Sequence, residues 1–132
     1  MLDLGGVPIR SAERTADDPI VLVGGHAAYN PEPLAPFIDA AVMGDGEEVT
    51  LEIDDAVRAW KTSGSRDRHD LLRRLAAVEG VYIPAFYEAR YTDDGRLKAT
   101  VPIEPGVPHI VPKRTVQDLE QWQYPKKQIV PM

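Results

Sequence analysis

The stretch that decides the fold is residues 19–46, PIVLVGGHAAYNPEPLAPFIDAAVMGDG. It contains two short apolar runs, at 20–23 and 40–43, and glycines follow each run directly. Short apolar runs bounded by turn residues are typical of buried parallel strands. Between the two runs, Asn30 suits the N-cap of a helix and Pro31 suits its first position. The apolar positions of that expected helix are Leu34, Phe37 and Ile38.

A second helix is expected over residues 47–61, directly after the second run. Its inward positions recur every three or four residues, as in an amphipathic helix: Val49, Ile53, Val57 and Trp60. Glu47 and Glu48 lie in its first turn, where negative charge stabilises the positive end of the helix dipole. The order strand, helix, strand, helix predicts parallel strands joined by right-handed crossovers.

The segments on either side extend this unit. Residues 1–4 are typical of the last turn of a helix that the glycines at 5–6 end, and residues 7–10 of a short strand. A further helix is expected over residues 69–78, with leucines inward. An open parallel sheet needs more than three strands to cover both of its faces. A chain that starts on the end of a helix is therefore expected to be a fragment.

The C-terminal part predicts a hairpin and an arm. Strands are expected at 86–91 and 96–101, around the turn signal Asp93-Asp94-Gly95. Six of the twelve prolines fall within 102–131, which predicts an extended arm with one or two helical turns at 115–122. The expected fold class is α/β: a partial parallel sheet with flanking helices, a β-hairpin and a proline-rich extended arm.

Composition narrows the class of protein. The 132 residues are 43% hydrophobic and 27% charged, which is ordinary for a soluble globular domain, and no apolar run approaches 18 residues. The first ten residues, MLDLGGVPIR, are not typical of a signal peptide, so a cytoplasmic protein is expected. A net charge of −6 argues against a nucleic-acid partner. With no cysteine, the chain cannot supply thiolates to an iron–sulfur cluster or a zinc site.

Two glycine-containing segments are the candidate binding sites, because ligands of open α/β sheets bind beyond the carboxyl ends of the strands. The first is Gly24-Gly25-His26, which could approach a phosphate or a cofactor tail, or simply form a tight turn. The second is Gly44-Asp45-Gly46-Glu47. Its acids repel an anion, so they could orient a ribose hydroxyl, a cation or a basic residue of a partner, or only begin a helix.

Catalytic motifs are missing from the sequence. The three histidines, at positions 26, 69 and 109, share no metal-ligand spacing. No serine has the Gly-x-Ser-x-Gly context, and there is no Walker loop and no Gly-x-Gly-x-x-Gly. The sequence therefore predicts neither catalytic residues nor a metal site, and the chain is not expected to be a complete enzyme.

Several separated motifs, in order, resemble one family. Residues 19–33 followed by 39–48 resemble the GG…NPEPL…D…GxGE pattern of the cobalamin-binding-type domain that precedes the barrel of radical SAM proteins. The upstream LDLGGVPIR at 2–10 and the downstream GVYIPAFYE at 80–88 resemble its Fe–S oxidoreductase subfamily. The likeness continues at VPKR, 111–114, and at IVP, 129–131, so it covers nearly the whole chain.

The resemblance implies a fragment of an N-terminal Rossmann-like domain. It implies that further strands precede Met1 and that a CxxxCxxC loop follows Pro131. The parent protein would hold a [4Fe–4S] cluster and S-adenosylmethionine, with cobalamin as a further candidate, whereas this chain would hold none of them. Gly24 and Gly25 match the family's glycines near the nucleotide tail of cobalamin, but the Asp-x-His-x-x-Gly motif for the axial histidine is absent. The implied domains are a partial cobalamin-binding-like unit (1–80), a hairpin extension (81–101) and a linker (102–132).

Three functions follow as hypotheses. The first is an accessory segment of a radical SAM iron–sulfur protein, not catalytic by itself, whose partner is the missing radical SAM domain of the same polypeptide. The second is a stand-alone cofactor- or nucleotide-binding module. The third is a protein-interaction module: an incomplete sheet has an open edge, which invites pairing, so a homodimer of the chain is expected.

Overall fold

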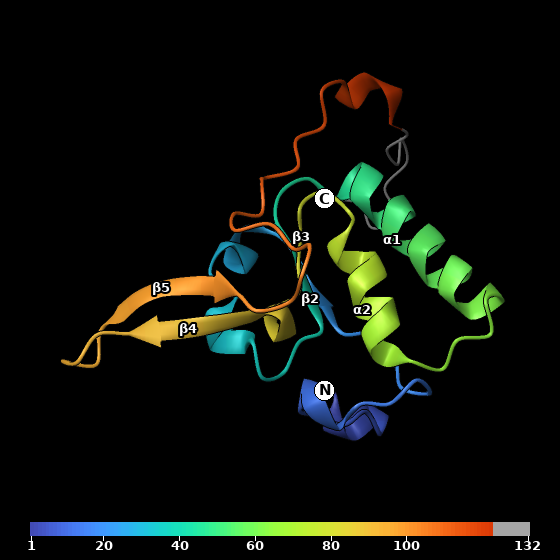
Figure 1. Cartoon of the computed structure of the whole chain (residues 1–132). Helices are drawn as coiled ribbons and strands as arrows, with labels where there is room; N and C mark the ends of the chain where they lie inside the picture. Colours follow the sequence, from blue (N-terminus) through green and yellow to red (C-terminus); the bar gives the residue numbers. More distant parts are fainter. Residues whose placement is uncertain (123–132) are drawn as a thin grey trace.

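The computed structural model describes residues 1–122, which form a mixed α/β domain with a projecting hairpin (Figure 1). Its sheet has the order β1-β2-β3. Strand β1 (Leu22–Val23) pairs parallel with β2 (Ala40–Val42), as expected from the two apolar runs. Strand β3 (Val81–Tyr82) pairs antiparallel with β2, so the prediction of an all-parallel sheet is wrong. One parallel pair does not make a Rossmann-like sheet.

The reversed strand follows from the number of helices that precede it. Helix α1 (Gly46–Thr62) begins at the carboxyl end of β2, and α2 (Arg68–Ala76) runs back toward that end. The chain therefore enters β3 where β2 finishes, and Met43 donates its N–H to the Gly80 carbonyl at 2.7 Å. A single crossover helix would have returned the chain in the parallel sense.

Both long helices confirm the predicted periodicity and build the main core. They lie together on one side of the sheet (Figure 1). The buried side chains between helices and sheet are Val49, Ile53, Trp60, Leu71, Leu75, Ala40, Val81, Ile83 and Phe86. The Asp67 side chain caps α2 by accepting the His69 N–H at 2.9 Å, and the Trp60 indole donates to the Asp67 carbonyl at 3.0 Å. Each helix is thereby joined to the short loop between them.

The helix expected after Asn30 is not formed, and that prediction is wrong. The chain makes a 3₁₀ turn at His26–Tyr29 and another at Glu32–Leu34 instead. Pro36 has no N–H to donate to the carbonyl of Glu32, and its ring crowds that carbonyl, so an α-helix cannot continue. Ile38 is still buried, in a small second cluster with Ala41 and Tyr82 on the other face of the sheet.

The first residues also differ from expectation in part. A 3₁₀ turn at Asp3–Gly5 ends on Gly6, which has a φ of 68° and so takes the stop position that was expected of it. Residues 7–10 form no strand, because no other strand lies beside them for pairing within the described residues.

The segment at 11–19 is fastened by a buried ion cluster. Arg14 and Asp39 form an ion pair at 2.8 Å, with side chains that are 0% and 1% exposed. Arg14 also donates to the carbonyls of Pro8 (3.0 Å), Ile9 (2.9 Å) and Phe37 (2.7 Å). Arg68 approaches Asp39 at 3.1 Å. Three segments that are distant in sequence, 8–14, 37–39 and the start of α2, therefore meet around one buried ion pair.

The hairpin is confirmed. Strands β4 (Tyr87–Tyr91) and β5 (Leu97–Pro102) pair antiparallel, and Gly95 supplies the positive φ, 80°, in the turn. The hairpin projects away from the helices (Figure 1).

The arm that follows returns to the sheet. Arg114 forms a parallel bridge with Gly44, and Val116 is buried. A 3₁₀ turn at Leu119–Gln121 confirms helical structure within 115–122. The last part of the expected arm, 123–132, lies outside the described residues. Across residues 1–122, none of the helices has both the length and the apolar character needed to cross a bilayer.

Candidate functional site

A pocket of about 440 Å³, called the glycine pocket below, lies where β1 and β2 end and α1 begins. Six of the seven residues predicted as a binding site line it: Gly24, Gly25, Gly44, Asp45, Gly46 and Glu47. They come together because the carboxyl ends of parallel strands meet at one edge of a sheet. Leu22, Val42 and Ile53 supply its apolar wall. The pocket is within the size range, about 300–1,000 Å³, of sites for small molecules.

His26, the seventh predicted residue, is not in the pocket lining. It is exposed and begins the 3₁₀ turn at His26–Tyr29. Gly25, directly before it, has a φ of 83° and turns the chain at the rim. The structure therefore separates the histidine from the glycines with which it was grouped.

Gly44, in the pocket wall, lies in close contact with the backbone of the arm. Its φ is 116°, and a Cβ built on it would lie 2.0 Å from the carbonyl oxygen of Arg114. The arm contacts the backbone here: Arg114 donates its N–H to Met43 O at 2.7 Å and accepts the Asp45 N–H at 3.1 Å. Gly44 is therefore required for the close approach of the arm, whether or not a ligand binds.

Residues 114–116 of the arm also form hydrogen bonds with acidic side chains at the start of α1. The Asp45 carboxylate accepts the Val116 N–H at 2.9 Å and makes no capping bond to α1. The Arg114 guanidinium bonds Glu48 at 2.8 Å and Glu52 at 2.5 Å, and these carboxylates raise the pKa of Arg114. The Thr50 hydroxyl donates to the Gly46 carbonyl at 2.6 Å. This leaves Glu47, exposed at the rim, as the lining carboxylate with no hydrogen bond among the described residues.

The lining of the pocket suits a small ligand that carries no negative charge. It combines an apolar wall with backbone groups and two carboxylates, and no lysine or arginine side chain lines it. A phosphate would be repelled by Asp45 and Glu47, whereas a sugar hydroxyl could donate to Glu47. No cluster of three metal-ligating side chains occurs among residues 1–122.

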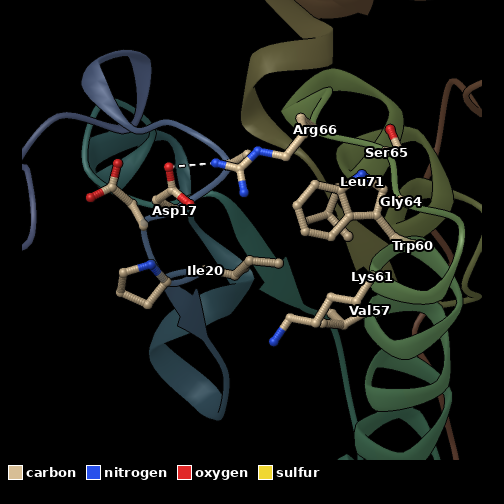
Figure 2. A pocket seen from close by; sticks show the side chains of 12 residues that line it. Asp17, Ile20, Val57, Trp60, Lys61, Gly64, Ser65, Arg66 and Leu71 are labelled. Atoms are coloured by element: carbon tan, nitrogen blue, oxygen red, sulfur yellow. Dashed lines mark hydrogen bonds and ion pairs between the residues drawn. The ribbon is translucent and has the colours of Figure 1, made fainter.

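A larger pocket, about 780 Å³, lies between residues 16–20, which precede β1, and the last turns of α1 with the loop after it (Figure 2). Ile20 points into it opposite Val57 and Trp60, and an ion pair between Asp17 and Arg66 crosses its mouth (Figure 2). None of the predicted site residues lies here. The helical positions were predicted as core, but nothing in the sequence indicated that the facing side would be left open.

Outside the two pockets, a hydrogen bond joins Tyr82 of β3 to the 3₁₀ turn at Glu32–Leu34. The Tyr82 hydroxyl donates to the Glu32 carboxylate, and the ring centroids of Tyr82 and Tyr87 lie 4.6 Å apart. Burial, reinforced by the neighbouring Glu32 carboxylate, raises the pKa of Tyr82. The bond links β3 to the loop before β2.

Comparison with known proteins decides the family. A family model described as "Radical SAM proteins, N-terminal" matches residues 1–84. The chain belongs to this family. No curated protein and no solved structure matches it. The matched residues of this radical SAM N-terminal domain include all three strands of the sheet, both helices and the whole lining of the glycine pocket.

The family association has a chemical consequence. Radical SAM proteins are enzymes, and membership implies an iron–sulfur cluster and S-adenosylmethionine in the whole protein. The 132-residue chain has no cysteine, so it supplies none of the thiolates that hold such a cluster.

Proposed function

We propose that this chain is the accessory N-terminal segment of a radical SAM iron–sulfur protein and is not catalytic by itself. The observation that carries the proposal is the family match over residues 1–84 in a chain without cysteine. Its partner is the radical SAM domain of the same polypeptide, and the proline-rich arm is the linker toward it.

The first test is to read the natural gene past both ends of the sequence. We expect the frame to continue beyond Met132 into a CxxxCxxC loop. A stop codon directly after residue 132 would exclude the accessory role in a longer chain. In a second, biochemical test, the 132-residue chain is incubated anaerobically with iron, sulfide and S-adenosylmethionine. We expect no cluster absorbance and no cleavage of S-adenosylmethionine, and either signal would refute the non-catalytic part.

A second function is favoured by the pocket at the ends of β1 and β2, as a site for a nucleoside. The base would pack on Leu22, Val42 and Ile53, and a ribose hydroxyl would donate to Glu47. Cobalamin is the alternative ligand, of which a pocket of about 440 Å³ would hold only a part, and no histidine lines the pocket to serve as its axial ligand.

Calorimetric titration distinguishes these ligands. Adenosine is expected to bind more tightly than AMP, because the phosphate meets Asp45 and Glu47. Glu47→Gln should reduce adenosine affinity by about tenfold, the loss of about one charge-assisted hydrogen bond. Glu13→Gln, at an exposed site outside the pocket, is the matched control. Tighter binding of AMP than of adenosine, or equal effects of the two variants, would refute the nucleoside site.

A further inference from the structure

The free edge of β1 presents an unused row of backbone groups. Within residues 1–122, β1 has β2 as its one neighbouring strand. Val21 directs its backbone toward β2: its carbonyl accepts the N–H of Asp39 at 2.9 Å and that of Ala40 at 3.3 Å, and its own N–H donates to the Asp39 carboxylate at 2.7 Å. Backbone direction alternates along a strand, so Leu22 directs its N–H and C=O away from β2.

The same alternation places two further residues on that side. Ile20 and Gly24 lie just outside the paired residues of β1, and continued alternation would direct their backbone groups to the same free edge. Their side of the strand faces α1, because Ile20 lines the larger pocket and Leu22 lines the smaller one. The Leu22 side chain is 40% exposed, as an apolar group at an uncovered edge.

The edge is complementary to itself. If two copies are related by a twofold axis at Leu22, Leu22 lies opposite the Leu22 of the other copy, and Ile20 lies opposite Gly24. All three pairs are then hydrogen-bonded pairs of an antiparallel ladder, with up to about six bonds. The bulky Ile20 meets a glycine that has no side chain, so the pairing is free of crowding. By the same alternation Pro19 would face β2, so its missing N–H does not interrupt this register.

We propose that β1 is an interaction surface for a second copy of this chain, which adds its own β1 in the antiparallel sense with Leu22 on the twofold axis. The paired strands join the two sheets into one. The proposal concerns the 132-residue chain and does not depend on a ligand in either pocket or on the radical SAM partner.

The mass of the chain in solution tests the association. Light scattering over a dilution series should show a mass that rises with concentration toward twice 14.6 kDa. Leu22→Lys places like charges directly opposite each other and should weaken the dimer by about tenfold or more. Leu51→Lys, at a 57% exposed leucine on α1, is the matched control and should leave the dimer unchanged. A monomer at all concentrations, or a dimer that survives Leu22→Lys, overturns the proposal.

A cross-link tests the register even if the lysine variant folds poorly. Opposite residues of a hydrogen-bonded antiparallel pair have Cα atoms about 5.5 Å apart, within the range of a disulfide. Because the chain has no cysteine, Leu22→Cys introduces the only thiol. Mild oxidation should give a covalent dimer much faster than it does for Leu51→Cys. Equal rates for the two variants would show random collision and refute the twofold pairing at Leu22.

Discussion

Replacing Arg14 by methionine tests whether the buried ion cluster holds the domain together. Arg14 is fully buried and donates to three backbone carbonyls as well as to Asp39. A methionine keeps much of the side-chain volume but removes every donor, so the Phe37 carbonyl and its neighbours lose their partners. Each buried polar group left without a partner costs about 1–3 kcal/mol.

The expected loss of unfolding free energy is about 3 kcal/mol. Breaking a buried ion pair by removing one partner typically costs about 3–5 kcal/mol. The lower end applies here, because Asp39 keeps Arg68 at 3.1 Å and the Val21 N–H at 2.7 Å. Native domains have a total stability of only about 5–15 kcal/mol, so the variant should fold but unfold early.

Urea unfolding followed by circular dichroism measures this loss. With a urea slope of about 1–3 kcal/mol per M, the midpoint for Arg14→Met should fall by about 1–3 M. Arg58→Met is the control, because Arg58 and Asp54 form an exposed pair with side chains 74% and 52% accessible. Its effect should stay within about 0.5 kcal/mol. A loss below about 1 kcal/mol for Arg14→Met, or one equal to that of the control, would refute the reasoning.

Two further variants test the arm and the tyrosine cluster. Gly44→Ala should cost about 2–4 kcal/mol in urea unfolding, because its Cβ would meet the Arg114 carbonyl; Gly95→Ala, with positive φ but open space, should cost only about 1–2 kcal/mol. Equal losses would show that the contact with the arm is unimportant. The raised pKa of Tyr82 means that the native state holds the phenol proton more tightly than the unfolded state, so stability should fall as the pH rises above about 10. Tyr82→Phe should flatten this alkaline decline in unfolding measured from pH 9 to 11, and an unchanged slope would contradict the assignment.

The parts of the fold that depend on local patterns could be predicted from the sequence. Helix α1 follows from an apolar period that runs from Val49 to Trp60, and the hairpin follows from the turn at Asp93-Asp94-Gly95. The helix expected after Asn30 fails because capping residues favour a start there, while Pro36 prevents the hydrogen bond that would continue it.

The parts that depend on distant contacts could not be predicted. The direction of β3 depends on how α2 packs against α1, and Val81–Tyr82 is too short to show any periodicity. The pocket glycines come together because both apolar runs are strands of one parallel pair, which the sequence does indicate. That Asp45 and Gly44 are engaged by residues 114–116 is invisible to any local pattern, because those contacts cross about 70 positions of the chain.

Because the arm contacts the loop at Gly44, this loop can reach its final structure only after residues 114–116 have been synthesised. The walls of the glycine pocket lie early in the chain, but the bonds from Arg114 and Val116 that hold Asp45 in place come from residues made much later. A ribosome adds about 5–20 residues per second, so the nascent domain spends seconds with this loop unsecured. A segment trimmed at residue 84, the end of the family match, would stay in that immature condition permanently. Completion of the pocket is thus coupled to the emergence of residues 114–116, long after both of its walls have been made.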